Sequence, residues 1–143
     1  MPGYSGTPLP KKLGIKPGFH VHFLAAPAEV LEELREVLAA CATASDGKSK
    51  NHAPLDFVMV FTKSQAELKE GVRRVAKLLQ PAGMLWVSWP KKTSVVASNL
   101  DENRVREIGL AAGLVDVKVC AVTEVWSGLK FVIPKGQRTE RLK

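Results

Sequence analysis

The stretch Leu55–Lys92, LDFVMVFTKSQAELKEGVRRVAKLLQPAGMLWVSWPKK, decides the fold of this 143-residue chain. Its first seven residues are almost all apolar, which indicates a strand that is buried on both faces. Ser64 and Glu67 then form the S-x-x-E pattern that begins a helix, and Pro81–Gly83 ends this helix before a second apolar strand, Met84–Ser88. A strand, a helix and a strand in this order predict one right-handed crossover of a parallel sheet.

The residues on either side of this unit continue the same alternation of elements. Phe19–Leu24 alternates apolar residues with His20 and His22, which predicts a half-exposed strand at an edge of the sheet. A helix with an acidic outer face is expected from Pro27 to Cys41, and residues 42–54 read as a long surface loop. Asn99 with Glu102 predicts the start of a further helix, and residues 117–122 and 129–133 predict a closing hairpin.

The net charge of +7 lies mostly at the two ends of the chain. Residues 1–18 carry three of these charges and residues 134–143 carry three more, so residues 19–133 are nearly neutral. We therefore expect a basic N-terminal arm, residues 1–18, and a basic C-terminal tail, residues 134–143, around one domain, residues 19–133. Basic ends attract polyanions in a salt-dependent way but do not form a surface that reads nucleic acid.

The sequence also indicates a compartment. No apolar run approaches the roughly 18 residues that cross a membrane, and MPGYSGTPLPKKLG lacks the apolar core of a secretory signal. Cys41 falls on the apolar stripe of a predicted helix, and Cys120 falls inside a predicted strand. An activated thiol needs a neighbouring base or a helix N-terminus, so we expect two structural thiols in a cytoplasmic protein.

One edge of the predicted sheet gathers candidate binding residues. Parallel sheets bind ligands beyond the carboxyl ends of their strands. Thr62 and Lys63 follow the first strand of the crossover, and Trp89, Lys91 and Lys92 follow the second, so these side chains are expected to lie together. Ammonium groups beside a helix N-terminus could bind a small anion, and the indole could cover a planar ligand. In the alternative interpretation, the tryptophan packs under the turn and the lysines are solvated.

The histidines are candidates for a metal site. His20 and His22 share one strand face and could hold a metal with His52, yet no cluster of carboxylates or cysteines accompanies them. We therefore expect solvated edge histidines, no metal and no cofactor. No GxSxG, P-loop or HExxH pattern occurs, so we predict no catalytic residues.

Two resemblances add to this interpretation. The segments GYSGTPLPKKLGIKPG, LWVSWPKK, GLAAGLVDVKVCAV and WSGLKFV resemble DUF3052, a bacterial family of small proteins without assigned function. More generally, LGIKPGFHVHFLAAP and LLQPAGMLWVSW are similar to the first strand and to the segment before the fifth strand of class I S-adenosylmethionine methyltransferases. The resemblance implies a three-layer, Rossmann-like α/β domain.

The chain departs from the methyltransferase pattern where the cofactor would bind. Ala25–Ala28 stands where these enzymes place glycines that let the backbone approach S-adenosylmethionine, and Pro27 removes one N–H group. The equivalents of the family's second and third strands are expected to be absent, replaced by residues 42–54. The predicted sheet is therefore mostly parallel and five-stranded, in the order 1-2-3-5-4 along the chain, with the last strand antiparallel.

These observations predict a non-catalytic binding or interaction module. We expect it to bind a small anionic ligand through Thr62, Lys63, Trp89, Lys91 and Lys92, and to form a homodimer through the edge of its first strand. Two alternatives stay open. One is a reduced S-adenosylmethionine-dependent or other transferase, and the other is a nucleic-acid-associated protein that acts through its basic ends.

Overall fold

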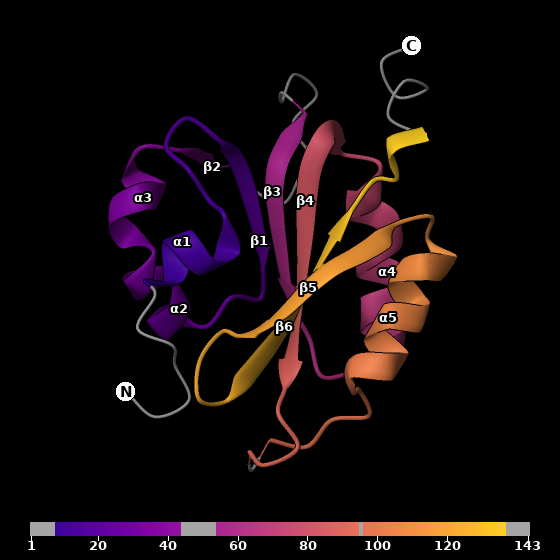
Figure 1. The fold of residues 1–143 in the computed structure, drawn as a ribbon. Coiled ribbons are helices and arrows are strands. Elements are labelled where there is room, and N and C mark those ends of the chain that lie inside the picture. The colour runs from indigo at the N-terminus through magenta and orange to yellow at the C-terminus, as the bar shows by residue number, and fades with distance from the viewer. Residues whose placement is uncertain (1–7, 44–53, 95, 137–143) are drawn as a thin grey trace.

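The computed structural model describes residues 8–43, 54–94 and 96–136, which form a six-stranded sheet with helices on both faces (Figure 1). The strands are β1 (His20–Leu24), β2 (Ala42–Thr43), β3 (Leu55–Phe61), β4 (Leu79–Pro90), β5 (Val115–Ala121) and β6 (Trp126–Val132). Their order across the sheet is β2-β1-β3-β4-β6-β5. Strands β2, β1, β3 and β4 are parallel, and β6 is antiparallel to both of its neighbours.

The predicted order of strands is confirmed, with one addition. The five expected strands correspond to β1, β3, β4, β5 and β6, and they lie in the order 1-2-3-5-4 with the last one antiparallel. The addition is β2, a two-residue strand that pairs with His20 and Val21 of β1, on the side of β1 away from β3. It falls in residues 42–54, where we expected only a loop, and residues 44–53 lie outside the described part of the chain.

The helices form a layer on each side of the sheet, as the three-layer prediction requires (Figure 1). One layer holds α1 (Leu9–Leu13), α2 (Ala28–Glu33) and α3 (Arg35–Ala39). The other holds α4 (Gln65–Ala76) and α5 (Glu102–Ala111). The single helix expected from Pro27 is therefore two short helices that meet at Leu34, whose side chain is fully buried.

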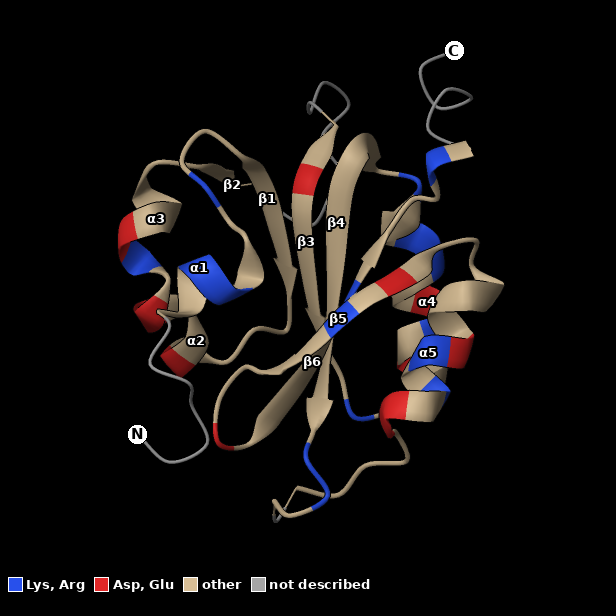
Figure 2. Ribbon diagram, in the orientation of Figure 1, with Lys and Arg blue, Asp and Glu red and all other residues tan. Residues whose placement is uncertain are grey.

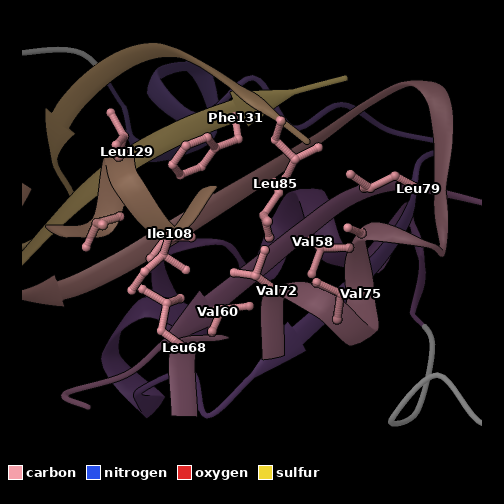
Figure 3. Close-up of a cluster of buried hydrophobic side chains, with 14 of the residues drawn as sticks. Val58, Val60, Leu68, Val72, Val75, Leu79, Leu85, Ile108, Leu129 and Phe131 are labelled. Atoms are coloured by element: carbon pink, nitrogen blue, oxygen red, sulfur yellow. The ribbon is translucent and has the colours of Figure 1, made fainter. Parts of the chain in front are cut away.

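Two hydrophobic cores lie on opposite faces of the sheet because successive residues of a strand point to opposite sides. Figure 3 shows the core under α4 and α5, to which β3 contributes Val58 and Val60. The other core lies under α1, α2 and α3, and there β3 contributes Phe57, Met59 and Phe61. The almost uninterrupted apolar sequence of β3 follows from this double burial.

The basic arm that we expected at residues 1–18 does not lie wholly outside the domain. Helix α1 begins directly after Pro8, and Leu9, Leu13 and Ile15 are buried in the second core. The indole Nε1–H of Trp86 donates a hydrogen bond of 2.8 Å to the carbonyl of Leu13. Residues 8–15 are thus part of the packed structure, and residues 1–7 lie outside the described part of the chain.

The end of α4 also differs from the expectation. The helix ends at Ala76, with Lys77 as its C-cap residue, and the next strand begins at Leu79. Residues 81–83, which we expected to terminate the helix, form part of β4 instead. The register of the β3–β4 pairing shifts between Leu55, which pairs with Leu79, and Phe57, which pairs with Met84. Residues 81–83 of β4 therefore lie at this irregular position of the sheet.

Candidate functional site

The loops that follow β3 and β4 lie at the same end of the sheet, as the parallel crossover requires. Figure 2 shows the basic residues of both loops there, at the lower end of the view. These loops contain Lys63, Lys91 and Lys92, which we predicted to bind an anion. The structure separates the five predicted residues into different environments, however, and only part of the predicted set shares one pocket.

Thr62 is buried, and its hydroxyl organises the loop that leads into α4. The hydroxyl donates to Oε1 of Glu67 at 3.2 Å and accepts from the backbone N–H of Ser64, also at 3.2 Å. Lys63 has an exposed side chain, and its backbone carbonyl accepts hydrogen bonds from Oγ of Ser98 and N–H of Asn99. Thr62 therefore orders its own loop, and Lys63 joins that loop to the one before α5.

The N-terminus of α4, which we expected to face an anion, is capped by the protein itself. Ser64 Oγ accepts from the N–H of Glu67 at 3.3 Å, as the sequence predicted. Asn99 Oδ1 accepts from the N–H of Gln65 at 2.9 Å, so a side chain from a distant loop occupies a second donor. The prediction that Asn99 begins α5 is wrong, because Asp101 is the N-cap residue of that helix.

Trp89, Lys91 and Lys92 line one pocket of about 440 Å³, which we call the lysine pocket. Its other lining residues come from the same loop, the start of α5 and β6: Thr93, Asp101, Glu102, Asn103 and Ser127. The Trp89 side chain is 5% exposed and belongs to the core under α4 and α5, so it forms a wall and not a movable cover. Sequence reasoning missed the two acidic residues, because only the fold brings the start of α5 to the end of β4.

A second pocket, of about 520 Å³, opens between the ends of β1 and β3 and helix α4; we call it the Ala25 pocket. Thr62 lines it together with Leu24, Ala25, Val60, Phe61, Ala66, Glu67, Glu70, Gly71 and Arg74. Ala25 has φ of +59°, in the left-handed region that residues with a Cβ rarely adopt. A strained backbone at the end of β1 is typical of a site where the fold determines chain direction against local preference.

The histidines differ from each other. His20 is partly exposed; its backbone N–H donates to Oδ2 of Asp56 at 2.7 Å, and its Nδ1 lies 3.6 Å from the same oxygen. His22 is only 2% exposed, so its predicted solvation is wrong. Its strand is not the outermost one, because β2 pairs with β1. In the described part of the chain no three His, Cys, Asp or Glu side chains are grouped to hold a metal, and His52 lies outside that part.

Both cysteines are unpaired thiols that the structure does not activate. Burial raises the pKa of the Cys41 thiol, whose Sγ donates to the carbonyl of Lys16. Burial also raises the pKa of Cys120, although the charges of Lys12 and Lys118 act in the opposite direction. A raised pKa reduces the thiolate fraction at neutral pH, which fits the structural role that the sequence predicted.

Solved structures with a similar fold include methyltransferases. A fibrillarin pre-rRNA processing protein of Methanococcus jannaschii superimposes with a TM-score of 0.55 at 12% identity, over 90% of this chain and 70% of that one. Magnesium protoporphyrin IX methyltransferase of Synechocystis PCC 6803, solved with bound SAH, superimposes with a TM-score of 0.58 at 14% identity, over 87% of this chain and 78% of that one. A putative type 11 methyltransferase of Sulfolobus solfataricus superimposes with a TM-score of 0.57 at 20% identity, over 87% of this chain and 89% of that one.

These likenesses show that the fold is the Rossmann-like α/β fold of methyltransferases, as we expected from the sequence. No curated protein matches the chain in sequence. Of the helices in the described residues, none combines the length and the apolar character needed to cross a membrane. A model of the DUF3052 family, described as proteins of unknown function, matches residues 10–135, which is most of the chain. The chain belongs to the DUF3052 family.

Proposed function

We propose that this protein is a non-catalytic, cytoplasmic binding module that takes a small anionic ligand in the lysine pocket. The observation that carries the proposal is the position of Lys91 and Lys92 beside Trp89, around one hollow at the carboxyl end of β4. Ligands of parallel α/β sheets bind at this edge. Neither lysine forms an ion pair with a carboxylate in the described part of the chain, so both ammonium groups are available to a ligand.

The two acidic residues of the lysine pocket, Asp101 and Glu102, already interact with groups of α5. Asp101 Oδ1 accepts from the N–H of Arg104 at 2.8 Å, and Glu102 Oε2 lies 2.7 Å from Nη2 of Arg106. Their remaining oxygens can accept hydrogen bonds from a ligand. We therefore expect a ligand with a phosphate or carboxylate for the lysines and with hydroxyl or amino groups for the opposite wall.

The choice of a binding module over an enzyme follows from the side chains around the pocket. The described residues that line it include no histidine and no cysteine. Its lysines lie on a loop in which Lys91 N–H donates to the carbonyl of Val125 at 2.7 Å, and Ser94 Oγ donates to the carbonyl of Lys91. Asp101 and Glu102 already form hydrogen bonds with groups of α5, and a fixed loop with ammonium groups suits the binding of an anion.

The test compares two double variants of equal charge. Inorganic pyrophosphate should raise the melting temperature of the wild-type protein, because a ligand that binds only the native state stabilises it. Lys91→Ala with Lys92→Ala should abolish this increase. Lys69→Ala with Lys77→Ala, on the exposed side of α4 and at its C-cap, should retain it. An increase that persists in the first variant would remove the lysine pocket as the site.

A second candidate function is binding of S-adenosylmethionine, and the Ala25 pocket favours it. This pocket lies at the end of β1, where methyltransferases bind that cofactor, and Ala25 adopts the left-handed conformation that glycine would adopt easily. S-adenosylhomocysteine should then raise the melting temperature of the wild type and of the Lys91→Ala, Lys92→Ala variant alike. A response to pyrophosphate alone would favour the lysine pocket.

The proposed module also includes a homodimer through the edge of β1. Among the residues that the structure describes, β2 pairs with His20 and Val21, so its two residues cover part of that edge. A native mass spectrum of the purified protein tests this part separately. A dimer would support edge pairing, whereas a monomer at micromolar concentration would exclude a stable dimer of this kind.

A further inference from the structure

A groove of about 570 Å³ runs between α4 and α5 on the side that faces away from the sheet. Three cationic residues line it at intervals of four residues: Lys69 and Arg73 of α4, and Lys77, the C-cap residue of that helix. Residues four apart lie on one face of a helix and about 6 Å apart along its axis, so these charges form a row of about 12 Å. Arg104 of α5 adds a fourth cation.

The floor of the groove is aliphatic. Val72, Ala76 and Ile108 line it and are almost fully buried, and Ala111 and Ala112 line it at the end of α5. Val72, Ala76 and Ile108 belong to the core under α4 and α5, and Figure 3 shows Val72 and Ile108 in it. An aliphatic floor with a basic rim fits an occupant that carries apolar and acidic side chains together.

The charges of the rim are not fully compensated within the protein. Arg73 pairs with Glu70, and Arg104 pairs with Glu107 at 3.1 Å. Lys69 and Lys77 form no ion pair with a carboxylate of the described residues. Figure 2 shows Lys and Arg on both helices of this layer. The row of α4 therefore keeps two cations, about 12 Å apart, that a partner can neutralise.

We propose that the α4–α5 groove binds an acidic, amphipathic helix of a partner protein. The geometry calls for carboxylates at four-residue intervals, which face Lys69 and Lys77, and for aliphatic side chains on the adjacent face, which contact the floor. A nucleic acid would satisfy the cations but offers no aliphatic side chains for the floor. A second copy would present α2 and α3, but these are two separate helices of six and five residues, and neither spans the row.

The probe is a synthetic peptide of about 18 residues, above the length at which isolated helices are marginal. It carries Glu at every fourth position and Leu on the neighbouring face. A matched peptide carries Gln in place of Glu, and a third carries Lys. Titration of isotope-labelled protein, followed by the backbone amide resonances, should shift residues of α4 and α5, including Lys69, Lys77, Ala111 and Ala112, with the Glu peptide and much less with the other two.

Charge reversal in the protein gives the decisive comparison. Lys69→Glu with Lys77→Glu should weaken binding of the Glu peptide roughly tenfold. The same variant should bind the Lys peptide more tightly than the wild type does. Lys91→Glu with Lys92→Glu changes the net charge equally at another surface and should leave the affinity unchanged. Both pairs are on the surface, and circular dichroism checks that each variant is folded.

Several outcomes would overturn the proposal. Equal affinity for the Glu and Gln peptides would show that the row of cations does not select the partner. If the amide resonances that shift lay outside α4 and α5, or if no resonance shifted at millimolar peptide, the groove would be excluded as the binding site. If a single-stranded oligonucleotide shifted the same amide resonances and bound more tightly than the Glu peptide, the surface would be assigned to nucleic acid. Self-association of the wild type that the Lys69→Glu, Lys77→Glu variant loses would assign it to a second copy.

Discussion

The ring of Phe131 on β6 fills the space beside Gly109 on α5 that a side chain would otherwise occupy. A Cβ atom at Gly109 would lie 2.1 Å from Cε1 of this ring, far inside van der Waals contact. The glycine therefore lets α5 lie directly against the sheet. Gly71 of α4 differs, because the atoms nearest to a Cβ there, from Leu24 and Val60, lie 4.0 Å away.

The same substitution should therefore have opposite effects in the two helices. Gly109→Ala should lower the free energy of unfolding by about 1–3 kcal/mol, because overpacking outweighs the helix preference of alanine. Gly71→Ala should raise it by up to about 1 kcal/mol, because alanine fits and favours the helix. Urea unfolding followed by circular dichroism measures both. Changes of the same sign would contradict the distinction between the two contacts.

The hydrogen bond from Trp86 to Leu13 gives a test of how the N-terminal segment is held. Trp86→Phe removes the indole N–H and leaves the carbonyl of Leu13 without this donor in a buried position. The free energy of unfolding should fall by about 1–3 kcal/mol from the unpaired carbonyl, with a further loss for the smaller ring.

A matched control for this prediction is Trp126→Phe. Trp126 is only partly buried, and a phenylalanine there can retain the edge contact with the ring of Phe61. Limited proteolysis should cut near α1 faster in Trp86→Phe than in either the wild type or the control. Equal rates in the three proteins would mean that this hydrogen bond does not hold α1 on the sheet.

The order of the strands could be predicted because it depends on local pattern and on general rules of connection. The apolar run of β3 and the Ser64 cap determine a crossover, and the short link between β5 and β6 requires a hairpin. Strand β2 could not be predicted, because two residues show no period. The burial of His22 could not be predicted either, since its alternation within β1 is the pattern of an exposed face.

The candidate site was predictable only as a region. The ends of β3 and β4 had to meet at one edge, which brought Trp89, Lys91 and Lys92 together. Sequence spacing does not show that Asn99 reaches back to cap α4, or that Asp101 enters the lysine pocket. Both depend on the path of the loop between β4 and α5, which tertiary contacts determine.

Lys118 and Lys130 lie directly opposite each other on β5 and β6. Burial and the charge of Lys118 both lower the pKa of Lys130, so the two ammonium groups disfavour each other. Lys118→Glu replaces repulsion with attraction and should raise the free energy of unfolding by roughly 0.2–1 kcal/mol at low salt. Lys118→Gln should give a smaller gain. Equal stability of the Glu and Gln variants, measured by thermal unfolding, would contradict this interpretation.

Arg106 joins α5 to β5 through Asp116. Its Nε lies 2.9 Å from Oδ2 of Asp116, and this hydrogen bond lowers the pKa of the carboxyl group below its ordinary value of 3.8. A folded-state pKa below the unfolded one means that the pair stabilises the protein above pH 3.8 and that this contribution is lost as the pH falls through the folded-state pKa. Asp116→Asn removes the charge but nearly keeps the shape.

The Asp116→Asn variant should therefore be less stable than the wild type at neutral pH, and the difference should shrink in acid. Urea unfolding at neutral pH and at several values below pH 3.8 measures it. Glu107→Gln is the control, because its ion pair with Arg104 is more exposed and joins residues of the same helix, so its effect at neutral pH should be smaller. A difference for Asp116→Asn that stays constant into acid would show that the side chain acts through its shape and not through its charge.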